Sequence, residues 1–422
     1  MSIEFQHSLP PRAESVPGGS KLTRRFASRI AAGPLARLRA LEEVSADACI
    51  RVDELIALAA RGLPRMRKKG LFAHTARAVK TNAGWSEQPE GESLRYTAMV
   101  ALGLSKLDVA AQRQVLDGNT AADLARTAEA RAETTDDPGA IALAAWAAAE
   151  AGHFHASRLF RKLAALLASQ SSVATVNCAW ALIAALAGRY FGDTRELATF
   201  AASRLIGGQA ASGLFPHVLP ASVNGRLRAH IGCFADQVYP IQALSRLHAA
   251  HGHPAAMAAA EACAARICSL QGPAGQWWWH YDSRDGSVVE GYPVYSVHQH
   301  AMAPMALLDL WQAGGSGHWR AIVSGLDWLD RHPEVLAPLI AHDKNVIWRK
   351  VARREPNKAV RAMSAFTTAL KPGMHLPWLD AVFPPSRVDY ECRPYELGWL
   401  LYAWLSGDEA VNRAPGVEDS DA

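Results

Sequence analysis

The stretch QGPAGQWWWHYD, residues 271–282, sets three consecutive tryptophans directly after a glycine-rich turn. Its first seven residues have the form Gln-x-x-x-Gly-x-Trp, with Gln271, Gly275 and Trp277 at the fixed positions. Residues 209–215, QAASGLF, repeat this form 62 residues earlier with phenylalanine in the last place. Each copy follows a predicted helix, so the spacing indicates an internal repeat of about one helical hairpin.

The turn has a physical role in such a repeat. Glycine lets the chain leave a helix in the left-handed conformation, and the Gln271 amide can bond backbone groups that a helix end leaves without partners. We therefore interpret Gln271, Gly275 and Trp277 as structural. Three consecutive tryptophans cannot all face one side of an element, so we expect one or two in the core. The others, with His280 and Asp282, are expected at a site.

Helical periodicity dominates the rest of the chain. Apolar residues recur at three- and four-residue spacing in segments such as residues 34–62, and several segments end at glycine or histidine, as helix C-termini do. The best candidate for an extended piece is residues 286–298, GSVVEGYPVYSVH. We predict a single helical domain over residues 34–410, between a disordered basic segment (1–33) and an acidic disordered tail (411–422).

Helix pairs joined by Gln-x-x-x-Gly-x-Trp turns resemble the terpenoid cyclase/protein prenyltransferase superfamily. The resemblance rests on residues 209–215 and 271–277 and on the succession of predicted helix pairs from about residue 85 to 405. It implies an all-α fold, an α/α toroid with few or no strands, whose helical hairpins form a ring with the site at one mouth. The six-hairpin toroid of many glycosidases, polysaccharide lyases and sugar epimerases has the same succession of helix pairs without requiring that turn.

The catalytic motifs of the superfamily's known enzymes are not found. Protonation-initiated cyclases use D-x-D-D, and the nearest match is TTDD, residues 134–137, with threonine in the first place. Pro138 follows this stretch and suits a helix start, so we expect Asp136 and Asp137 to be caps. The sequence has no D-D-x-x-D motif for magnesium and diphosphate, and DYEC, residues 389–392, resembles the zinc ligands of protein prenyltransferases in composition only.

Polar and aromatic residues are concentrated at loops and helix starts, and twelve of the sixteen histidines lie at or after residue 217. Turns at one mouth of a toroid converge, so acids and imidazoles there can do acid–base chemistry, while aromatic rings stack on sugars and arginine holds a carboxylate. The predicted catalytic residues are His280, Asp236, Asp282, His298 and Glu391. The predicted substrate-binding residues are Trp85, Arg95, His217, Tyr239, Trp278, Tyr295, His300, Arg393 and Tyr395.

We expect neither a metal nor a cofactor. His298 and His300 stand at i and i+2, which do not share a helix face. The histidines of HAAHGH, residues 248–253, are interpreted as helix C-terminal caps. Glu391 and Arg393 have two interpretations, a site pair or a simple ion pair.

These residues favour an enzyme that acts on a polar glycan or glycan intermediate through acid–base chemistry of the hydrolase, lyase or epimerase type. Two alternatives stay open. One is a divergent terpenoid cyclase-like enzyme with Asp136 or Asp236 as its acid. The other is a non-enzymatic helical scaffold that binds a peptide or protein in its concavity.

Charge and composition add limits on partners and compartment. The net charge is +4 for 422 residues, with fifteen Lys and Arg against seven Asp and Glu in residues 1–80. We interpret that basic end as a solvated face and tail, with an anionic partner as the alternative, and expect no nucleic acid. No apolar run reaches membrane-span length, and six scattered cysteines without metal spacing favour a reducing compartment. We therefore predict a cytoplasmic protein with a small-molecule or glycan substrate and leave its oligomeric state open.

Overall fold

The structure, a computed structural model, describes residues 36–81, 84–353, 357–376 and 378–407. The predicted N-terminal segment (1–33) and acidic tail (411–422) lie outside the described residues. The domain boundaries at these two positions therefore stay predictions.

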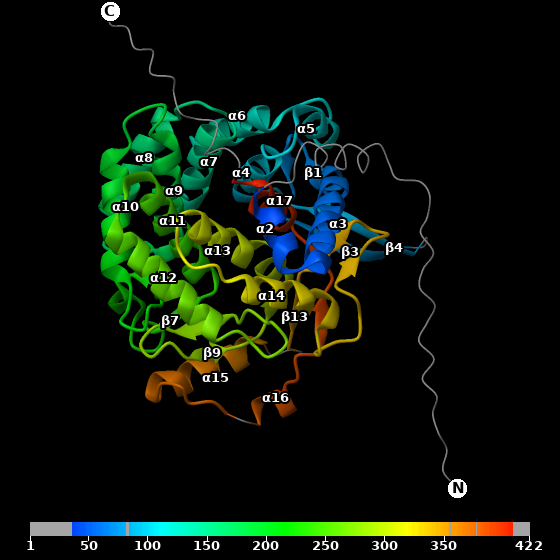
Figure 1. Ribbon diagram of the computed structural model, residues 1–422, viewed down its shortest axis with the longest axis vertical. Coiled ribbons are helices and arrows are strands. Elements are labelled where there is room, and N and C mark those ends of the chain that lie inside the picture. The colour runs from blue at the N-terminus through cyan, green and yellow to red at the C-terminus, as the bar shows by residue number, and fades with distance from the viewer. Residues whose placement is uncertain (1–35, 82–83, 354–356, 377, 408–422) are drawn as a thin grey trace, which may run out of the picture. The chain divides into compact units, whose positions relative to one another are not determined.

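Six helices, buried on nearly every side, form an inner ring (Figure 1). They are α4 (Leu94–Leu104), α7 (Pro138–Glu150), α9 (Thr175–Gly188), α11 (Ala235–His251), the π-helical η3 (His298–Met302) continued by α13 (Ala303–Gln312), and α17 (Pro394–Leu405). Each packs on the next in this order, and α17 packs on α4, so the ring is closed. Small residues such as the alanines of α7 allow these helices to approach on several sides.

Six further helices cover the ring from outside. They are α3 (Ala46–Gly62), α6 (Ala121–Ala132), α8 (Ser157–Ser169), α10 (Arg195–Gly208), α12 (Pro254–Ser269) and α14 (Trp319–Arg331). Each has one apolar stripe, as in α14, where Ile322, Leu326 and Leu329 are buried. The two layers make an α/α toroid, so the predicted fold class is confirmed.

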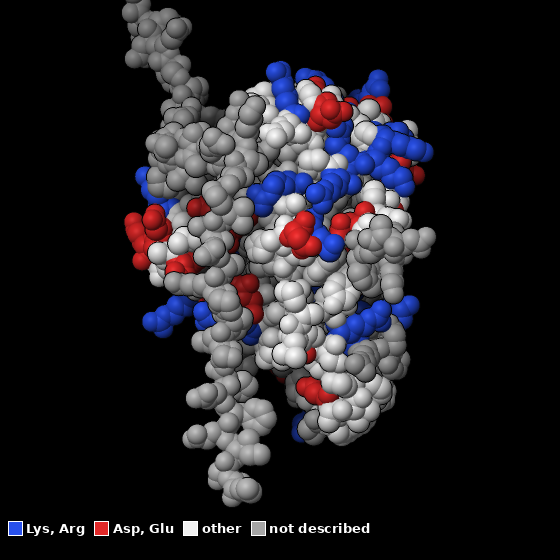
Figure 2. All heavy atoms as spheres, turned by 90° about the vertical axis from the view of Figure 1, so that its right-hand side faces the viewer, with Lys and Arg blue, Asp and Glu red and all other residues white. Residues whose placement is uncertain are grey.

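The remaining helices lie outside the two layers. They are α2 (Ala36–Val44), η1 (Leu63–Met66), α5 (Val109–Val115), η2 (Ala221–Asn224), α15 (Asn357–Leu370) and α16 (Leu379–Val382). On the face in Figure 2, Lys and Arg side chains gather in the upper part, at the level of α5 and α6 in Figure 1, and acidic side chains are mixed with them below. This face therefore carries no extended field of one sign.

Short antiparallel strands fill the connections. They are β1 (Arg67–Lys68), β2 (Leu71–Phe72), β3 (Thr75–Thr81), β4 (Gly84–Glu90), β5 (Val173–Ala174), β6 (Val218–Leu219), β7 (Ile231–Cys233), β8 (His280–Asp282), β9 (Val288–Glu290), β10 (Val294–Tyr295), β11 (Ile340–Ala341), β12 (Val346–Ile347), β13 (Lys350–Ala352), β14 (Arg387–Asp389) and β15 (Glu391–Cys392). The three-stranded sheets have the orders β15-β3-β4, β7-β8-β9 and β10-β13-β14. Strands β9 and β10 lie in the segment 286–298 that was predicted to be extended.

The two glycine turns have the same geometry. The Gln271 side chain donates to the carbonyls of Gly275 (3.0 Å) and of Ala321 in α14 (2.9 Å). The Gln209 side chain donates to the carbonyls of Gly213 (2.7 Å) and of Ala259 in α12 (2.8 Å), again four and fifty residues away. Gly275 has φ +94°, and a Cβ there would collide with the Ser324 carbonyl of α14. Each turn thus fastens one hairpin to the next outer helix, which confirms the structural interpretation.

Glycine also permits the ring to close. Helices α4 and α17 cross at Gly103 and Gly398, and a Cβ on Gly103 would overlap the backbone of Gly398. Neither residue has a positive φ, so the requirement is for space rather than for backbone conformation.

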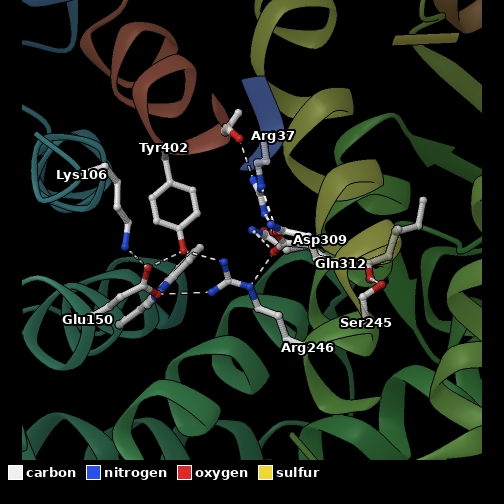
Figure 3. Close-up of polar contacts among 12 residues, drawn as sticks. Arg37, Lys106, Glu150, Ser245, Arg246, Asp309, Gln312 and Tyr402 are labelled. Atoms are coloured by element: carbon white, nitrogen blue, oxygen red, sulfur yellow. Dashed lines mark hydrogen bonds and ion pairs between the residues drawn. The ribbon is translucent and has the colours of Figure 1, made fainter. Parts of the chain in front are cut away.

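A buried network of charged side chains joins the C-terminal parts of the inner helices (Figure 3). Arg246 of α11 donates to Asp309 of α13 (2.6 Å) and lies 3.3 Å from Glu150 at the end of α7. Tyr402 of α17 donates to Glu150 (2.6 Å), and Arg37 of α2 pairs with Asp309. Burial opposes ionisation of Glu150, but the charges around it hold its pKa well below its ordinary value. Each charged member has a partner of opposite charge, and removing Glu150 or Asp309 would leave a buried cation without its anion.

We expect Gly103→Ala to lower the free energy of unfolding by about 2–3 kcal/mol, because the added methyl overpacks the α4–α17 crossing. Urea-induced unfolding followed by circular dichroism measures this. The matched control is Gly207→Ala in α10, where an added Cβ meets nothing within 4 Å. Helix propensity alone should leave that variant unchanged or raise its stability by up to about 1 kcal/mol. Equal stabilities of the two variants would contradict the close crossing.

Candidate active site

Pairing of the short strands brings the N-terminal ends of the inner helices to one end of the ring. Strand β5 directly precedes α9 and pairs with β6, and β7 directly precedes α11 and pairs with β8. Strand β15 precedes α17 and pairs with β3, which pairs with β4 ahead of α4. We call this end of the ring the mouth. Helix N-termini carry partial positive charge, so the mouth favours anionic groups.

Aromatic rings form the floor of the mouth. Tyr239 of α11 packs edge-on against Trp180 of α9, with ring centroids 5.0 Å apart, and its hydroxyl accepts a hydrogen bond from Trp399 of α17 (2.8 Å). Tyr96 and Tyr395, at the starts of α4 and α17, contact each other with centroids 4.6 Å apart. This floor joins four inner helices, α4, α9, α11 and α17.

Asp236, in the first turn of α11, is fully buried. Its Oδ2 accepts from the backbone N–H of Cys233 (2.7 Å) and shares a hydrogen bond with Nδ1 of His217 (2.9 Å). Its Oδ1 is buried and has no hydrogen-bond partner among the described residues. His217 is 55% exposed, and its hydrogen bond and charge interaction with Asp236 raise its pKa. The carboxylate therefore has one oxygen held in place and one left unbonded.

A second group surrounds Trp279. Its ring contacts His280 (5.2 Å between centroids), Tyr295 (4.8 Å) and His298 (6.0 Å, stacked). Burial, followed by the charges of Arg361, His217 and Arg228, lowers the pKa of His280 to about 3. Burial likewise lowers the pKa of His298 to about 3. Both imidazoles are therefore neutral at neutral pH.

Charged side chains from β15, from α17 and from Arg349, the residue before β13, form the next part of the rim. The Arg349 guanidinium lies 4.9 Å from the centre of the Tyr295 ring, 3.9 Å from Glu391 and 3.5 Å from Glu396. Arg393 lies 3.6 Å from Glu391 and donates to the Tyr96 hydroxyl (2.8 Å). Arg77 of β3 also pairs with Glu391. Glu391 thus contacts three arginines, so its ion pair with Arg393 is part of a larger charged cluster.

Glu396 is the buried acid of this rim. Burial raises its pKa to about 7, although Arg349 and Arg393 act in the other direction. Its Oε2 accepts from the backbone N–H of Arg393 (3.1 Å) as part of a capping box. It is therefore a carboxyl that changes protonation near neutral pH, as general acids do.

Arg95 and Asp137 form the remaining side of the rim. Arg95 of α4 holds Asp137 through both carboxylate oxygens, with Nε 2.7 Å from Oδ2, and lies 5.6 Å from the Trp180 ring. Burial opposes ionisation of Asp137, but the hydrogen bonds and charge of Arg95 hold its pKa below its ordinary value. Asp137 also caps α7 as predicted, by accepting from the Gly139 N–H (3.0 Å).

Several predicted site residues lie elsewhere. Asp282 is buried and bound by Arg284 (2.7 Å), on the side of α15. Trp278 contacts Tyr292 and lines a pocket between β9 and α15. His300 is buried inside the ring, and its ring nitrogens have no partner among the described residues. The Trp85 side chain lies outside what the structure describes.

The remaining predicted residues lie at the mouth. They are His280, Asp236, His298, Glu391, Arg95, His217, Tyr239, Tyr295, Arg393 and Tyr395. Sequence reasoning missed Trp279, Arg349 and Glu396. Trp279 lies in the extended chain ahead of β8, two residues after the buried Trp277, and that spacing alone predicts the packed side, so it had no clear signal as a site residue. Arg349 and Glu396 had no local signal, since only tertiary packing brings them together.

In the part of the chain that the structure describes, one set of side chains has the spacing of metal ligands. Ligand atoms of His217, Cys233 and Asp236 all lie within 4.8 Å of one another. Tetrahedral zinc sites with bonds of about 2.0–2.3 Å place ligand atoms about 3.5 Å apart, so this set is wider than a formed site. Burial and the charge of Asp236 also raise the pKa of the Cys233 thiol, which disfavours the thiolate.

Fold comparisons identify the architecture, whereas sequence comparisons find nothing. No protein-family model and no curated protein matches the sequence. An unsaturated glucuronyl hydrolase specific for heparin is similar in structure, with TM-score 0.51 and 13% identity over 84% of this chain and 95% of that one. The unsaturated glucuronyl hydrolase of Bacillus sp. GL1 has TM-score 0.51 and 12% identity over 86% and 96%. A possible GH105 member from Klebsiella pneumoniae has TM-score 0.50 and 9% identity over 84% and 92%.

These similarities place the chain among the α/α toroids. At identities this low, the similarities show the fold alone. The chemistry has to be argued from the residues of the site. The predicted toroid fold is thus supported, whereas the terpenoid cyclase-like label is not confirmed.

We expect Asp236→Asn to lower the pKa of His217 toward the ordinary value of about 6.5, because the hydrogen-bonded charge is removed. Titration followed by NMR of the histidine ring protons measures this. The raised pKa means that His217 adds stability below about pH 6.5, and this stability is lost as pH rises through the folded-state pKa. Asp330→Asn, at an exposed pair with Arg51, is the control and should leave the His217 titration unchanged. An unchanged titration in Asp236→Asn would contradict the pairing.

Proposed function

We propose that the protein is an enzyme that acts on a polar, anionic glycan by acid–base chemistry at the mouth. The observation that carries the proposal is Asp236, a buried carboxylate with one oxygen held by His217 and the Cys233 N–H and the other unbonded among the described residues. Such a group can transfer a proton to or from a substrate held within hydrogen-bond distance. The solved structures with this fold include two unsaturated glucuronyl hydrolases, which adds support for a glycan.

Binding would rest on the aromatic and cationic rim. Trp279, which is half-buried, offers a ring face on which a sugar can stack, and Tyr295 packs against it. Arg349 and Arg393 are forked donors that match the geometry of a carboxylate, such as that of a uronate. The N-terminal ends of the inner helices add a favourable potential for the same negative charge.

Three carboxyl groups divide the chemistry. Asp137 is held ionised by Arg95 and serves binding or electrostatic stabilisation. Asp236 is the candidate acid–base group, and Glu396, with a pKa of about 7, is the second group that can exchange a proton near neutral pH. Hydrolysis, elimination and epimerisation all use such pairs, and the products distinguish them.

The charged rim favours a glycan over the alternative, a terpenoid cyclase-like reaction. A cavity that shelters a carbocation is lined by apolar and aromatic side chains. The floor of Trp180, Tyr239 and Trp399 fits that description, but Arg95, Arg349 and the acids around them do not.

The proposed setting is the cytoplasm. All six cysteines are unpaired, as in a reducing compartment. Among the described helices, none combines the length and the apolar composition that crossing a membrane demands.

We expect Asp236→Asn to reduce turnover of a uronate-bearing oligosaccharide about 10²–10⁴-fold, because amide cannot exchange the proton. The assay incubates the protein with saturated and unsaturated uronate oligosaccharides and neutral glycans, and it reads the products by mass spectrometry. Asp193→Asn, at an exposed pair with Arg195, is the control and should keep full activity. Turnover in Asp236→Asn equal to that of the unchanged protein would exclude Asp236, and turnover of prenyl diphosphates alone would support the cyclase-like alternative.

A further inference from the structure

Helix α15 (Asn357–Leu370) is amphipathic with its polar side inward. Ser364, Thr367 and Thr368 are buried, whereas Phe366 is 51% and Leu370 is 68% exposed. Helices of a globular protein ordinarily bury the apolar stripe and expose the polar one. This helix therefore presents to its surroundings the side that others bury.

Buried polar contacts hold α15 in this orientation. Thr368 Oγ1 is hydrogen-bonded to His230 Nε2 (3.0 Å), and the Thr368 carbonyl accepts from Arg284 (2.6 Å). Ser364 donates to Glu290 of β9 (3.2 Å). Turning the apolar side inward would break all three contacts and leave buried polar groups unpaired, so the outward apolar side is built into the packing.

Further exposed apolar side chains follow α15 in the chain. Met374, Trp378 and Val382 are 41%, 49% and 57% exposed and follow Phe366 and Leu370 at four-residue steps. Val223 and Leu227, each 55% exposed, lie on the segment that His230 ties to α15. Seven of the fourteen exposed large apolar side chains in the described residues thus belong to these two segments, which we call the α15 surface.

The α15 surface is also basic. Residues 221–230 and the described residues of 357–387 carry six cations: Arg226, Arg228, Lys358, Arg361, Lys371 and Arg387. They carry one acid, Asp380, which is already paired with Arg353 (2.7 Å). Exposed apolar and aromatic side chains flanked by Lys and Arg are the composition of segments that lie in the interface of an anionic membrane.

We propose that the α15 surface docks the protein on an anionic lipid bilayer. The exposed apolar side chains enter the headgroup region, where tryptophan is favoured, and the nearby cations add attraction to acidic lipids. A bilayer fits these side chains because it accepts exposed apolar groups without a matching groove. The charge balance of the α15 surface selects acidic over neutral lipids.

Docking would set the mouth beside the membrane. Helix α15 packs on β9 of the sheet β7-β8-β9, and the same sheet carries His280 at the rim of the mouth. The substrate class that follows is a glycan carried on a membrane lipid. This extension rests on the proposed function, whereas the docking itself does not.

The test is co-sedimentation of the full chain with vesicles of phosphatidylcholine alone and of phosphatidylcholine with about one third phosphatidylglycerol. We expect binding to the acidic vesicles only, weakened by salt. Phe366→Ser with Leu370→Ser should reduce this binding at least about tenfold, since both side chains are exposed and their loss removes the apolar contact. The matched control, Val109→Ser with Tyr190→Ser, removes two exposed apolar side chains outside the α15 surface and should bind as the unchanged protein does.

Equal vesicle binding by the Phe366/Leu370 variant, or no binding by the unchanged protein, overturns the proposal. A dimer in sedimentation equilibrium that this variant dissociates also overturns it, because the surface would then join two copies. Asp236→Asn separates the two proposals, because it should still bind vesicles. Retained vesicle binding with no activity on any glycan would contradict the proposed function and leave the docking proposal standing.

Discussion

Closure of the inner ring is the constraint on which the rest of the structure depends. Helix α17, near the C-terminus, packs between η3 and α4. Helix α3, from the N-terminal part of the chain, covers it. The crossing at Gly103 and Gly398 is close enough that neither can carry a side chain without displacement of the other helix. Segments about 300 residues apart must therefore meet before the ring closes, and α4 and α17 each gain their second inner neighbour only then.

The closed ring makes its two ends chemically different. Inner helices run the same way, so one end collects helix N-termini and the other collects C-termini. At the C-terminal end, Arg246, Glu150 and Asp309 satisfy one another in a network joined by Arg37 and Tyr402. At the mouth, Asp236 retains an unbonded oxygen among the described residues and Arg349 stands over a ring face. One end is thus tied together by ion pairs, and the other has groups left for a ligand.

Local sequence signals predicted the hairpin repeat well. The two glycine turns have identical hydrogen-bond offsets, because Gln209 and Gln271 each reach a carbonyl fifty residues ahead. The same local signals did not predict correctly which tryptophan lies beside the site residues. Trp278 was expected with the site, but the extended chain after the turn places it on the side of Tyr292, and Trp279 lies beside His298.

The sequence by itself determined the class of fold, the repeat of helical hairpins and most of the residue types at the mouth, since all three depend on local spacing and composition. The tertiary structure alone decided which acids and bases meet at the mouth: Asp137 with Arg95, and Glu396 with Arg349. It also decided that α15 turns its apolar side outward, against its own pattern. The physical reason is the same in each case, because these contacts join elements that only ring closure and packing bring together.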